Sequence, residues 1–233
     1  MAAKTKAEGR RRVIRRAAQR VFAQKGYHEA TISEVAHEAG ISEATIYEYF
    51  SSKEELLFSI PGEMERKTKE TLEFILDHVR GASHKIRAII YHYLWLYENH
   101  LDYGALIMLV LKHNRKFCET DAYQVVRERA RVLLRVVEEG IASGEFRSDT
   151  NPYLVRAMIL GTVEHLIIRR LLIGGPSDLW QFVDALTDQI IIGIRSDEAR
   201  EEWRRAKEPS EGSGPSRSDA PRVKPELDTW SEL

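Results

Sequence analysis

Side chains that could carry out chemistry are scattered along the 233 residues of the chain. The histidines form no catalytic arrangement with Cys118 or with a serine–carboxylate pair, and the sequence has neither a glycine-rich phosphate loop nor metal-ligand spacing. His92, His113 and His165 are therefore interpreted as core or pocket residues rather than as ligands. The sequence predicts a protein that is not an enzyme and needs no metal or cofactor.

Basic side chains are concentrated near the N-terminus, although the net charge of the whole chain is only −1. Between Met1 and Gly26 the only acidic residue is Glu8, whereas the basic residues are Lys4, Lys6, Arg10, Arg11, Arg12, Arg15, Arg16, Arg20 and Lys25. This local excess is large enough to attract a polyanion.

Composition places the chain among ordinary globular proteins, with 43% hydrophobic and 30% charged residues. Cys118 is the single cysteine, so no intrachain disulfide can form and a reducing compartment is expected. The basic N-terminus lacks the apolar stretch of a secretory signal, and apolar runs such as 105–111 are too short to span a membrane. We expect a soluble, cytoplasmic protein with no membrane association.

Helical periodicity runs through almost every segment before residue 196, without strand alternation or hairpin signals. The sequence therefore predicts an all-α fold. The expected helices are 10–25, 31–39, 43–50, 53–79, 83–99, 103–117, 121–143, 152–173 and 178–195. In the first of these, the predicted inner face consists of Val13, Ala17, Ala18, Val21 and Phe22, and Gly26 followed by Tyr27 is a C-terminal cap.

The next segments have the form of a helix-turn-helix. Thr31 to Glu34 and Ser52 to Glu55 are capping boxes, and Gly40 allows a tight turn after which Ser42 caps a short helix. The predicted inward-facing residues of the two short helices are Ile32, Val35, Ala36, Ala39, Ile46 and Phe50. Such a pair of capped helices also occurs in helical proteins that have no DNA-binding role, so the pattern alone leaves both interpretations open.

The longer stretch over residues 10–60 resembles the DNA-binding domain of the TetR family. The matching features are Phe22, Gly26-Tyr27, Thr31, Ile32, Val35-Ala36, Ala39-Gly40-Ile41-Ser42, Thr45-Ile46-Tyr47, Tyr49-Phe50, Lys53-Glu54 and Leu56. The resemblance implies an all-helical homodimer that acts as a ligand-responsive transcriptional repressor. Its DNA partner would be a near-palindromic double-stranded operator.

The resemblance also implies which residues approach DNA. They are Thr31, Ser42, Glu43, Ala44, Thr45, Tyr47, Tyr49 and Lys53. Thr31 and Ser42 would offer hydroxyls and helix N-termini to phosphates, Thr45 and Tyr47 would face the major groove, and Lys53 would pair with a phosphate. Thr31 and Ser42 are needed as caps in any case, and Tyr49 could instead belong to the core.

The helix-turn-helix itself is acidic, which departs from the pattern of many relatives. From Thr31 to Phe50 the charged residues are Glu34, Glu38, Glu43 and Glu48. Phosphate attraction must therefore come mainly from the basic first helix and Lys53. Glu43 and Glu48 either accept hydrogen bonds from cytosine N4 in the major groove or point to solvent.

The region after residue 55 is expected to bind a small effector and to dimerise. Candidate ligand-binding residues are Tyr91, Trp95, Met108, Leu111, Arg115 and Met158, with Phe117 nearby. Aromatic residues at helical spacing are also typical of an ordinary core, so this pattern alone does not establish a pocket.

A second similarity involves residues 137–146 and 156–164. These segments are similar to the C-terminal domain of TetR-type regulators of fatty acid degradation, which respond to long-chain acyl-CoA. Such an effector needs an apolar tunnel with cations near its mouth, and Lys112, His113, Arg115 and Lys116 could supply them. A solvated helix end explains the same cluster without a ligand. Aromatic or drug-like effectors are the alternative.

The last two predicted helices carry more apolar residues than one face would bury within a single subunit. The expected dimer interface consists of Leu160, Val163, Ile167, Phe182, Leu186 and Ile190. The predicted organisation is a DNA-binding domain over 1–55, an effector and dimerisation domain over 56–196, and a charged, disordered tail over 197–233. The rival hypothesis is a helical adaptor that does not bind DNA.

Overall fold

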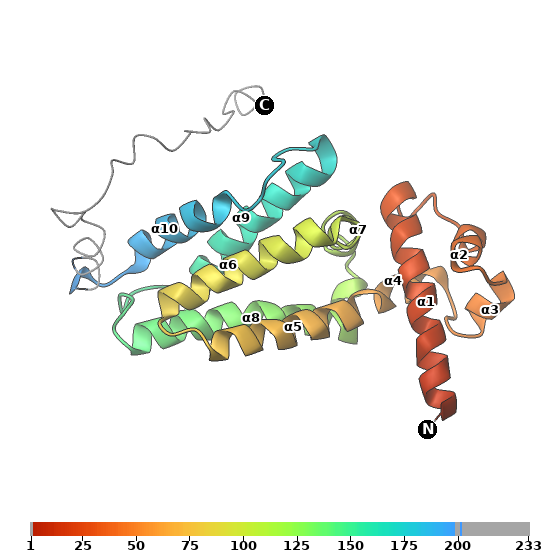
Figure 1. Ribbon diagram of the computed structural model, residues 1–233, viewed down its shortest axis with the longest axis horizontal. Helices are drawn as coiled ribbons and strands as arrows, with labels where there is room; N and C mark the ends of the chain where they lie inside the picture. The colour runs from red at the N-terminus through yellow and green to blue at the C-terminus, as the bar shows by residue number, and fades with distance from the viewer. Residues whose placement is uncertain (1, 199–200, 202–233) are drawn as a thin grey trace, which may run out of the picture.

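The computed structural model describes residues 2–198 and 201, and within them the chain is helical with no strand. The all-α prediction is confirmed. Figure 1 shows two parts, with α1 to α4 packed together at one end and α5 to α10 forming a longer helical bundle. No helix of the described residues is long and apolar enough to cross a membrane. Of the predicted tail, residues 197, 198 and 201 are helical and the rest lies outside the described residues.

Four helices form the N-terminal part: α1 (Ala2–Lys25), α2 (Ile32–Ala39), α3 (Glu43–Tyr47) and α4 (Lys53–Ser59). Gly26 ends α1 with a φ of 79°, and the Tyr27 ring packs edge-on against Phe22 with centroids 5.6 Å apart. Ala17, Ala18, Val21 and Phe22 are buried as predicted for the inner face of α1, but Val13 is exposed and Ile14 is buried in its place. Ile46 and Phe50 are buried as expected.

The C-terminal part begins with α5 (Pro61–Asp77) and α6 (Ala82–Asn99). It continues through α7 (Leu101–Ala105), a π-helix η1 (Leu106–Leu111), a 3₁₀ turn η2 (Phe117–Glu119), α8 (Asp121–Ala142), α9 (Pro152–Ile173) and α10 (Phe182–Ile194). In Figure 1, α5 and α8 lie side by side, α6 runs through the middle, and α9 and α10 form the opposite side.

Two segments that were each predicted to be one continuous helix are divided in the structure, so these two predictions are wrong. The helix expected over 53–79 is divided at Ile60, because Pro61 has no N–H and occupies the first position of α5. The helix expected over 103–117 is instead a short α-helix, the π-helix η1 and the 3₁₀ turn η2. A π-helix within a helical segment is rare and is frequently found at functional sites.

The predicted dimer residues are buried to a greater extent within one chain than the sequence suggested. Val163, Ile167, Leu186 and Ile190 are all buried within the protomer, whereas Leu160 and Phe182 are half-buried. The argument that these residues exceed what one subunit can bury is therefore wrong for the four buried residues. Packing of α9 and α10 against α6 covers this face. Exposed apolar side chains on the two helices are instead Leu154, Met158, Leu172, Ile173 and Ile192.

Candidate DNA-binding surface and ligand cavity

Local hydrogen bonds fix the helix-turn-helix. Thr31 Oγ1 accepts from Glu34 N at 3.2 Å, and Glu34 Oε2 accepts from Thr31 N at 2.9 Å, which completes the predicted capping box. Gly40 adopts a φ of 66° at the end of α2, where a side chain would be strained. Ser42 Oγ then accepts from Thr45 N at 3.1 Å. These bonds cap the start of each helix, and Gly40 allows the turn between them.

The short helix α3 presents its side chains outward. Tyr47 is 53% exposed, and Glu43, Ala44 and Glu48 are also exposed. Thr45 is half-buried, with its hydroxyl 3.0 Å from that of Ser42. Tyr47 is therefore the large side chain that α3 offers to a partner.

Lys53 and Tyr49 have neighbours within the protein. Lys53 Nζ lies 3.4 Å from the carbonyl oxygen of His28, to which it donates, and 4.5 Å from the centroid of the Tyr27 ring. Burial lowers the pKa of this ammonium, and the charge of Glu34 opposes the shift. Tyr49 is half-buried and borders a shallow hollow beside the N-terminal half of α1. These contacts place Lys53 against the segment that follows α1, and Tyr49 near α1 itself.

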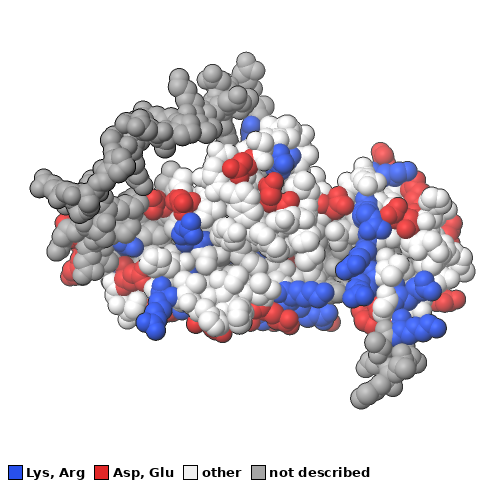
Figure 2. All heavy atoms as spheres, in the orientation of Figure 1, with Lys and Arg blue, Asp and Glu red and all other residues white. Residues whose placement is uncertain are grey.

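Two of the four acids of the helix-turn-helix are paired with the basic first helix. Glu34 lies 2.5 Å from Lys25, and Glu38 lies 2.7 Å from Arg20. Hydrogen bonds from Lys25 and Thr31 lower the pKa of Glu34. Figure 2 shows Lys and Arg gathered along α1, with acidic side chains toward α2 and α3. Pairing therefore reduces both the acidity of α2 and the free positive charge of α1.

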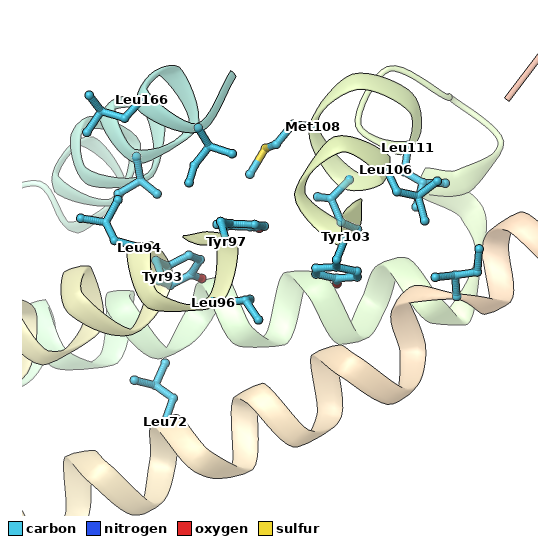
Figure 3. Close-up of a cluster of buried hydrophobic side chains, with 14 of the residues drawn as sticks. Leu72, Tyr93, Leu94, Leu96, Tyr97, Tyr103, Leu106, Met108, Leu111 and Leu166 are labelled. Carbon is cyan, nitrogen blue, oxygen red and sulfur yellow. The ribbon is translucent and has the colours of Figure 1, made fainter. Parts of the chain in front are cut away.

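A cavity of about 690 Å³ lies within the C-terminal part, a volume typical of small-molecule sites. Its walls come from α6, the π-helix η1, α8 and α9, with η2 at one end. The buried lining residues are Tyr93, Tyr97, Ile107, Met108, Phe117, Arg129, Leu134 and Val163. Figure 3 shows Tyr93 and Tyr97 projecting from α6 into the interior that Met108 also borders. The inner wall is mainly apolar and aromatic.

The rim of the cavity is basic. Arg127 and Arg131 are exposed on α8, one turn apart, and Arg156 is half-buried on α9 with its guanidinium 5.2 Å from the Tyr153 ring centroid. Lys112 also lines the cavity and pairs with Glu164. The cations therefore come from α8, from α9 and from the residue that follows η1.

The structure places only part of the predicted ligand set at this cavity. Met108 lines it, as do Lys112, His113 and Phe117. Tyr91 and Trp95 are exposed on another face of α6, where Tyr91 contacts Trp180 at 4.9 Å between centroids.

Other predicted ligand residues lie away from the lining. Leu111 is buried outside it, Arg115 is exposed elsewhere, and Met158 borders a separate hollow beside α10. Lys116 pairs with Glu54 and is not among the lining residues.

The histidines are divided between the core and the surface. His92 is buried and its Nε2 lies 3.1 Å from the Thr68 carbonyl oxygen, while burial together with the charge of Arg129 lowers its pKa to about 4. His113 lies at the cavity rim. The core or pocket interpretation is wrong for His165, which is exposed on α9 away from the cavity.

A buried ion pair lies at the inner wall of the cavity. Glu65 of α5 and Arg129 of α8 have side-chain exposures of 0% and 2%, and Arg129 Nε lies 2.6 Å from Glu65 Oε2. Tyr103 donates to Glu65 Oε1 at 2.5 Å. Burial and the neighbouring Glu65 raise the pKa of Tyr103, so its phenol stays neutral. Glu65 and Tyr103 were not among the predicted functional residues.

The end of the cavity formed by η2 touches the DNA-binding part. The Phe117 ring, which lines the cavity, lies 5.7 Å from the Phe58 ring of α4. Its neighbour Lys116 pairs with Glu54 of α4 at 3.1 Å. Helix α4 in turn packs on α1. One continuous set of contacts therefore runs from the cavity to the basic helix.

A capped helix-turn-helix beside a basic helix, joined to a helical bundle with an internal cavity, defines a DNA-binding regulator of the helix-turn-helix class. Residues 14–60 match the family described as bacterial regulatory proteins, tetR family, and residues 64–193 match the YsiA-like protein, C-terminal region. The chain belongs to the TetR family and is a transcriptional regulator, not an enzyme.

Several known proteins are similar over most of their length. The fatty acid metabolism regulator protein of Bacillus subtilis is 26% identical over 180 residues, which cover 77% of this chain and 93% of that protein. The crystal structure of FadR from Bacillus subtilis in complex with stearoyl-CoA matches with a TM-score of 0.72 and 26% identity, over 78% of this chain and 98% of that one. FadR from Bacillus halodurans has the same fold, with a TM-score of 0.73 and 23% identity over 79% and 95% of the two chains.

Proposed function

We propose that this regulator is a repressor that binds a near-palindromic operator as a dimer and releases it when a long-chain acyl-CoA occupies the cavity. The observation that carries the proposal is one cavity of about 690 Å³ that combines a mainly apolar inner wall with a basic rim. An acyl chain suits the apolar wall, and the phosphates of CoA suit the arginines and Lys112 at the opening. The stearoyl-CoA bound by the Bacillus subtilis FadR supports the same ligand class.

The proposed DNA contact is made by α3 in the major groove. Tyr47 is exposed on this helix, and its edge carries a hydroxyl for a base or phosphate. Lys53 and the basic face of α1 would add phosphate contacts that depend on salt concentration. Exposed Glu43 and Glu48 make α3 itself acidic, so attraction to the DNA backbone must come from these flanking cations.

The proposed release follows the contacts between the cavity and α4. A ligand that displaces Phe117 also moves the ring against which Phe58 packs. Because α4 contacts α1, such a displacement changes the position of the helix-turn-helix relative to the helix-turn-helix of the second subunit. The ligand can drive release only if it binds the displaced arrangement more tightly than the DNA-binding one.

The proposed dimer uses the exposed apolar side chains of α9 and α10. Leu154, Met158 and Ile192 are 59%, 48% and 45% exposed within the protomer. A second copy related by a twofold axis would cover this face on both subunits. The half-buried Leu160 and Phe182 could contribute at its edge.

Calorimetric titration with stearoyl-CoA tests the ligand class. We expect saturable binding that weakens at least about tenfold in Arg131→Ala and Arg156→Ala, because each loses a charged hydrogen bond to phosphate. Arg115→Ala is the matched control, since this arginine lies outside the cavity lining. If stearoyl-CoA does not bind and a compact aromatic compound does, the acyl-CoA proposal fails.

A further inference from the structure

The N-terminal half of α1 carries exposed charges that the described part of the fold does not use. The match to the tetR family begins at residue 14, whereas α1 begins at Ala2, and Figure 1 shows the N-terminal end of α1 projecting past α3. Lys6 and Arg10 are exposed on this half of the helix. Among the described residues, neither side chain has a hydrogen-bond or ion-pair partner. Both charges are therefore available to a partner molecule.

These two cations border the shallow hollow of about 410 Å³ beside Tyr49. The residues that line the hollow are Lys6, Ala7, Gly9, Arg10, Val13 and Tyr49. Positions 6, 9, 10 and 13 are three or four residues apart, so they share one face of α1. Tyr49 comes from the segment that directly follows α3, and the apolar Val13 is 44% exposed. The hollow therefore combines two cations, a phenol and an apolar side chain beside the recognition helix.

Gly9 lies on this face at a position where the fold does not require glycine. In the interior of a helix, only proline is less favourable than glycine, and α1 is helical on both sides of Gly9. A Cβ at this position would have nothing within 4 Å, so no described neighbour excludes a side chain. What glycine does provide is a helix backbone that another molecule can approach closely. The flanking charges of Lys6 and Arg10 favour an anionic molecule.

We propose that the hollow holds one strand of the sugar–phosphate backbone of the operator, which passes over Gly9. Lys6 and Arg10 are one helical turn apart, about 6 Å along α1, so they can each neutralise a phosphate of the same strand. The Tyr49 hydroxyl donates to a phosphate, and Val13 packs against the deoxyribose. The inference rests on the proposed function and adds a DNA contact on the part of α1 that precedes the family match.

Fluorescence anisotropy with the full-length protein, and with an operator selected from random DNA, tests the close approach at Gly9. Gly9→Leu should weaken operator binding by at least about tenfold, because the new side chain occupies the space of the strand. Its thermal stability should be equal to or higher than that of wild type, since leucine favours a helix more than glycine does. Gly62→Leu is the matched control, because a Cβ there also has nothing within 4 Å and Gly62 lies on α5. Wild-type affinity in Gly9→Leu overturns the inference.

A pair of arginine variants separates a defined contact from the general attraction of a basic helix. Arg10→Ala and Arg12→Ala remove the same charge from α1, but Arg12 lies on the side that meets Ile60 and Met64. We expect Arg10→Ala to weaken operator binding at least about threefold more than Arg12→Ala. Equal losses in the two variants would show that only the total charge of α1 matters, and they overturn the inference.

Replacing single operator phosphates with neutral methylphosphonates locates the contact on the DNA. One replacement in each half-site should weaken binding by wild type and leave the affinity of Arg10→Ala unchanged, because the variant has already lost that ion pair. If every replacement weakens both proteins equally, the hollow holds no strand. These outcomes leave the proposed function intact, whereas a wild-type protein that binds no DNA sequence contradicts the proposed function itself.

Discussion

Tyr47 is the residue on which sequence-specific DNA binding is expected to depend most. It lies on α3 and is 53% exposed, so the fold depends little on its side chain. Tyr47→Ala should weaken binding to the operator by at least about tenfold, because a base-edge or phosphate contact is worth about 1–3 kcal/mol. Thermal unfolding should be unchanged. If Tyr47→Ala binds the operator with wild-type affinity in fluorescence anisotropy, the recognition surface lies elsewhere.

Lys53 should affect binding to every DNA sequence in a similar way. Its ammonium would neutralise one phosphate, so Lys53→Ala should lower both specific and non-specific affinity and reduce the slope of log K against log salt by about 1. Lys85→Ala is the matched control, because Lys85 pairs with Glu139 in the C-terminal part. An unchanged salt slope in Lys53→Ala, with Lys85→Ala also unchanged, would exclude a phosphate contact for Lys53.

At the residue scale, sequence reasoning succeeded where the determinants are local. The capping roles of Thr31 and Ser42 depend on residues three positions away, and both were predicted. The cavity lining depends on which faces of distant helices meet. Tyr91 and Tyr97 lie on the same helix, yet only Tyr97 lines the cavity. The apolar pattern of α6 could not distinguish them, because the helix has neighbours on several sides.

Helix α8 passes close to the segment that follows it, and Gly140 makes this possible. A Cβ at Gly140 would lie 2.2 Å from the Phe146 ring and 2.8 Å from Ala82 Cβ. Gly140→Ala should therefore destabilise the protein by about 1–3 kcal/mol through overpacking. Urea denaturation measures the change. Gly62→Ala is the control, since nothing lies within 4 Å of its Cβ position and alanine favours the helix by up to about 1 kcal/mol. Equal stability of the two variants would contradict this packing.

The start of α6 is stabilised by a carboxylate from a distant loop. Glu145 Oε2 accepts from Ala82 N at 2.7 Å, and Oε1 accepts from Ser83 N at 2.8 Å. Burial alone would raise the pKa of Glu145, but the hydrogen bonds from Ser83 and Ala82 lower it below the usual value. A lowered folded-state pKa contributes stability above the unfolded pKa of about 4.3, and this stability is lost as the pH falls through the folded value.

Glu145→Gln should therefore lower stability by about 1 kcal/mol at pH 7. The difference from wild type should shrink as the pH is lowered below about 4, where the wild-type carboxylate also becomes protonated. Denaturation at several pH values measures it, with the exposed Glu138→Gln as the control. A difference that does not change with pH would show that the charge of Glu145 has no capping role.

At the element scale, the long helices α8, α9 and α10 could be predicted from their periodicity and from the breaks at Gly144 and Pro152. The π-helix η1 could not, because the apolar pattern of the sequence does not distinguish its i→i+5 hydrogen bonds, such as the bond from Lys112 N to Ile107 O, from those of an α-helix. Pro61 is a local signal for the division between α4 and α5. The continuous helical periodicity on both sides of it nevertheless led to the prediction of a single helix.

The whole molecule is expected to be a dimer. Light scattering should give twice the chain mass of 26.8 kDa. Ile192→Asp should produce monomers that keep their helical content, because this side chain is exposed within the protomer. Ile190→Asp is a poor test, since Ile190 is buried within the protomer and its replacement should also unfold the chain. A monomeric wild-type protein would exclude this arrangement.

Ligand-driven release from DNA tests the account most directly. An operator can be selected from random double-stranded DNA by the purified protein, labelled, and followed by fluorescence anisotropy while acyl-CoA is added. The account predicts that stearoyl-CoA lowers operator affinity by at least about tenfold, and that free CoA does so weakly. Arg156→Ala should need more ligand for the same release, whereas Arg115→Ala should match wild type. If saturating acyl-CoA binds the protein and the operator complex stays intact, the proposed release mechanism is contradicted.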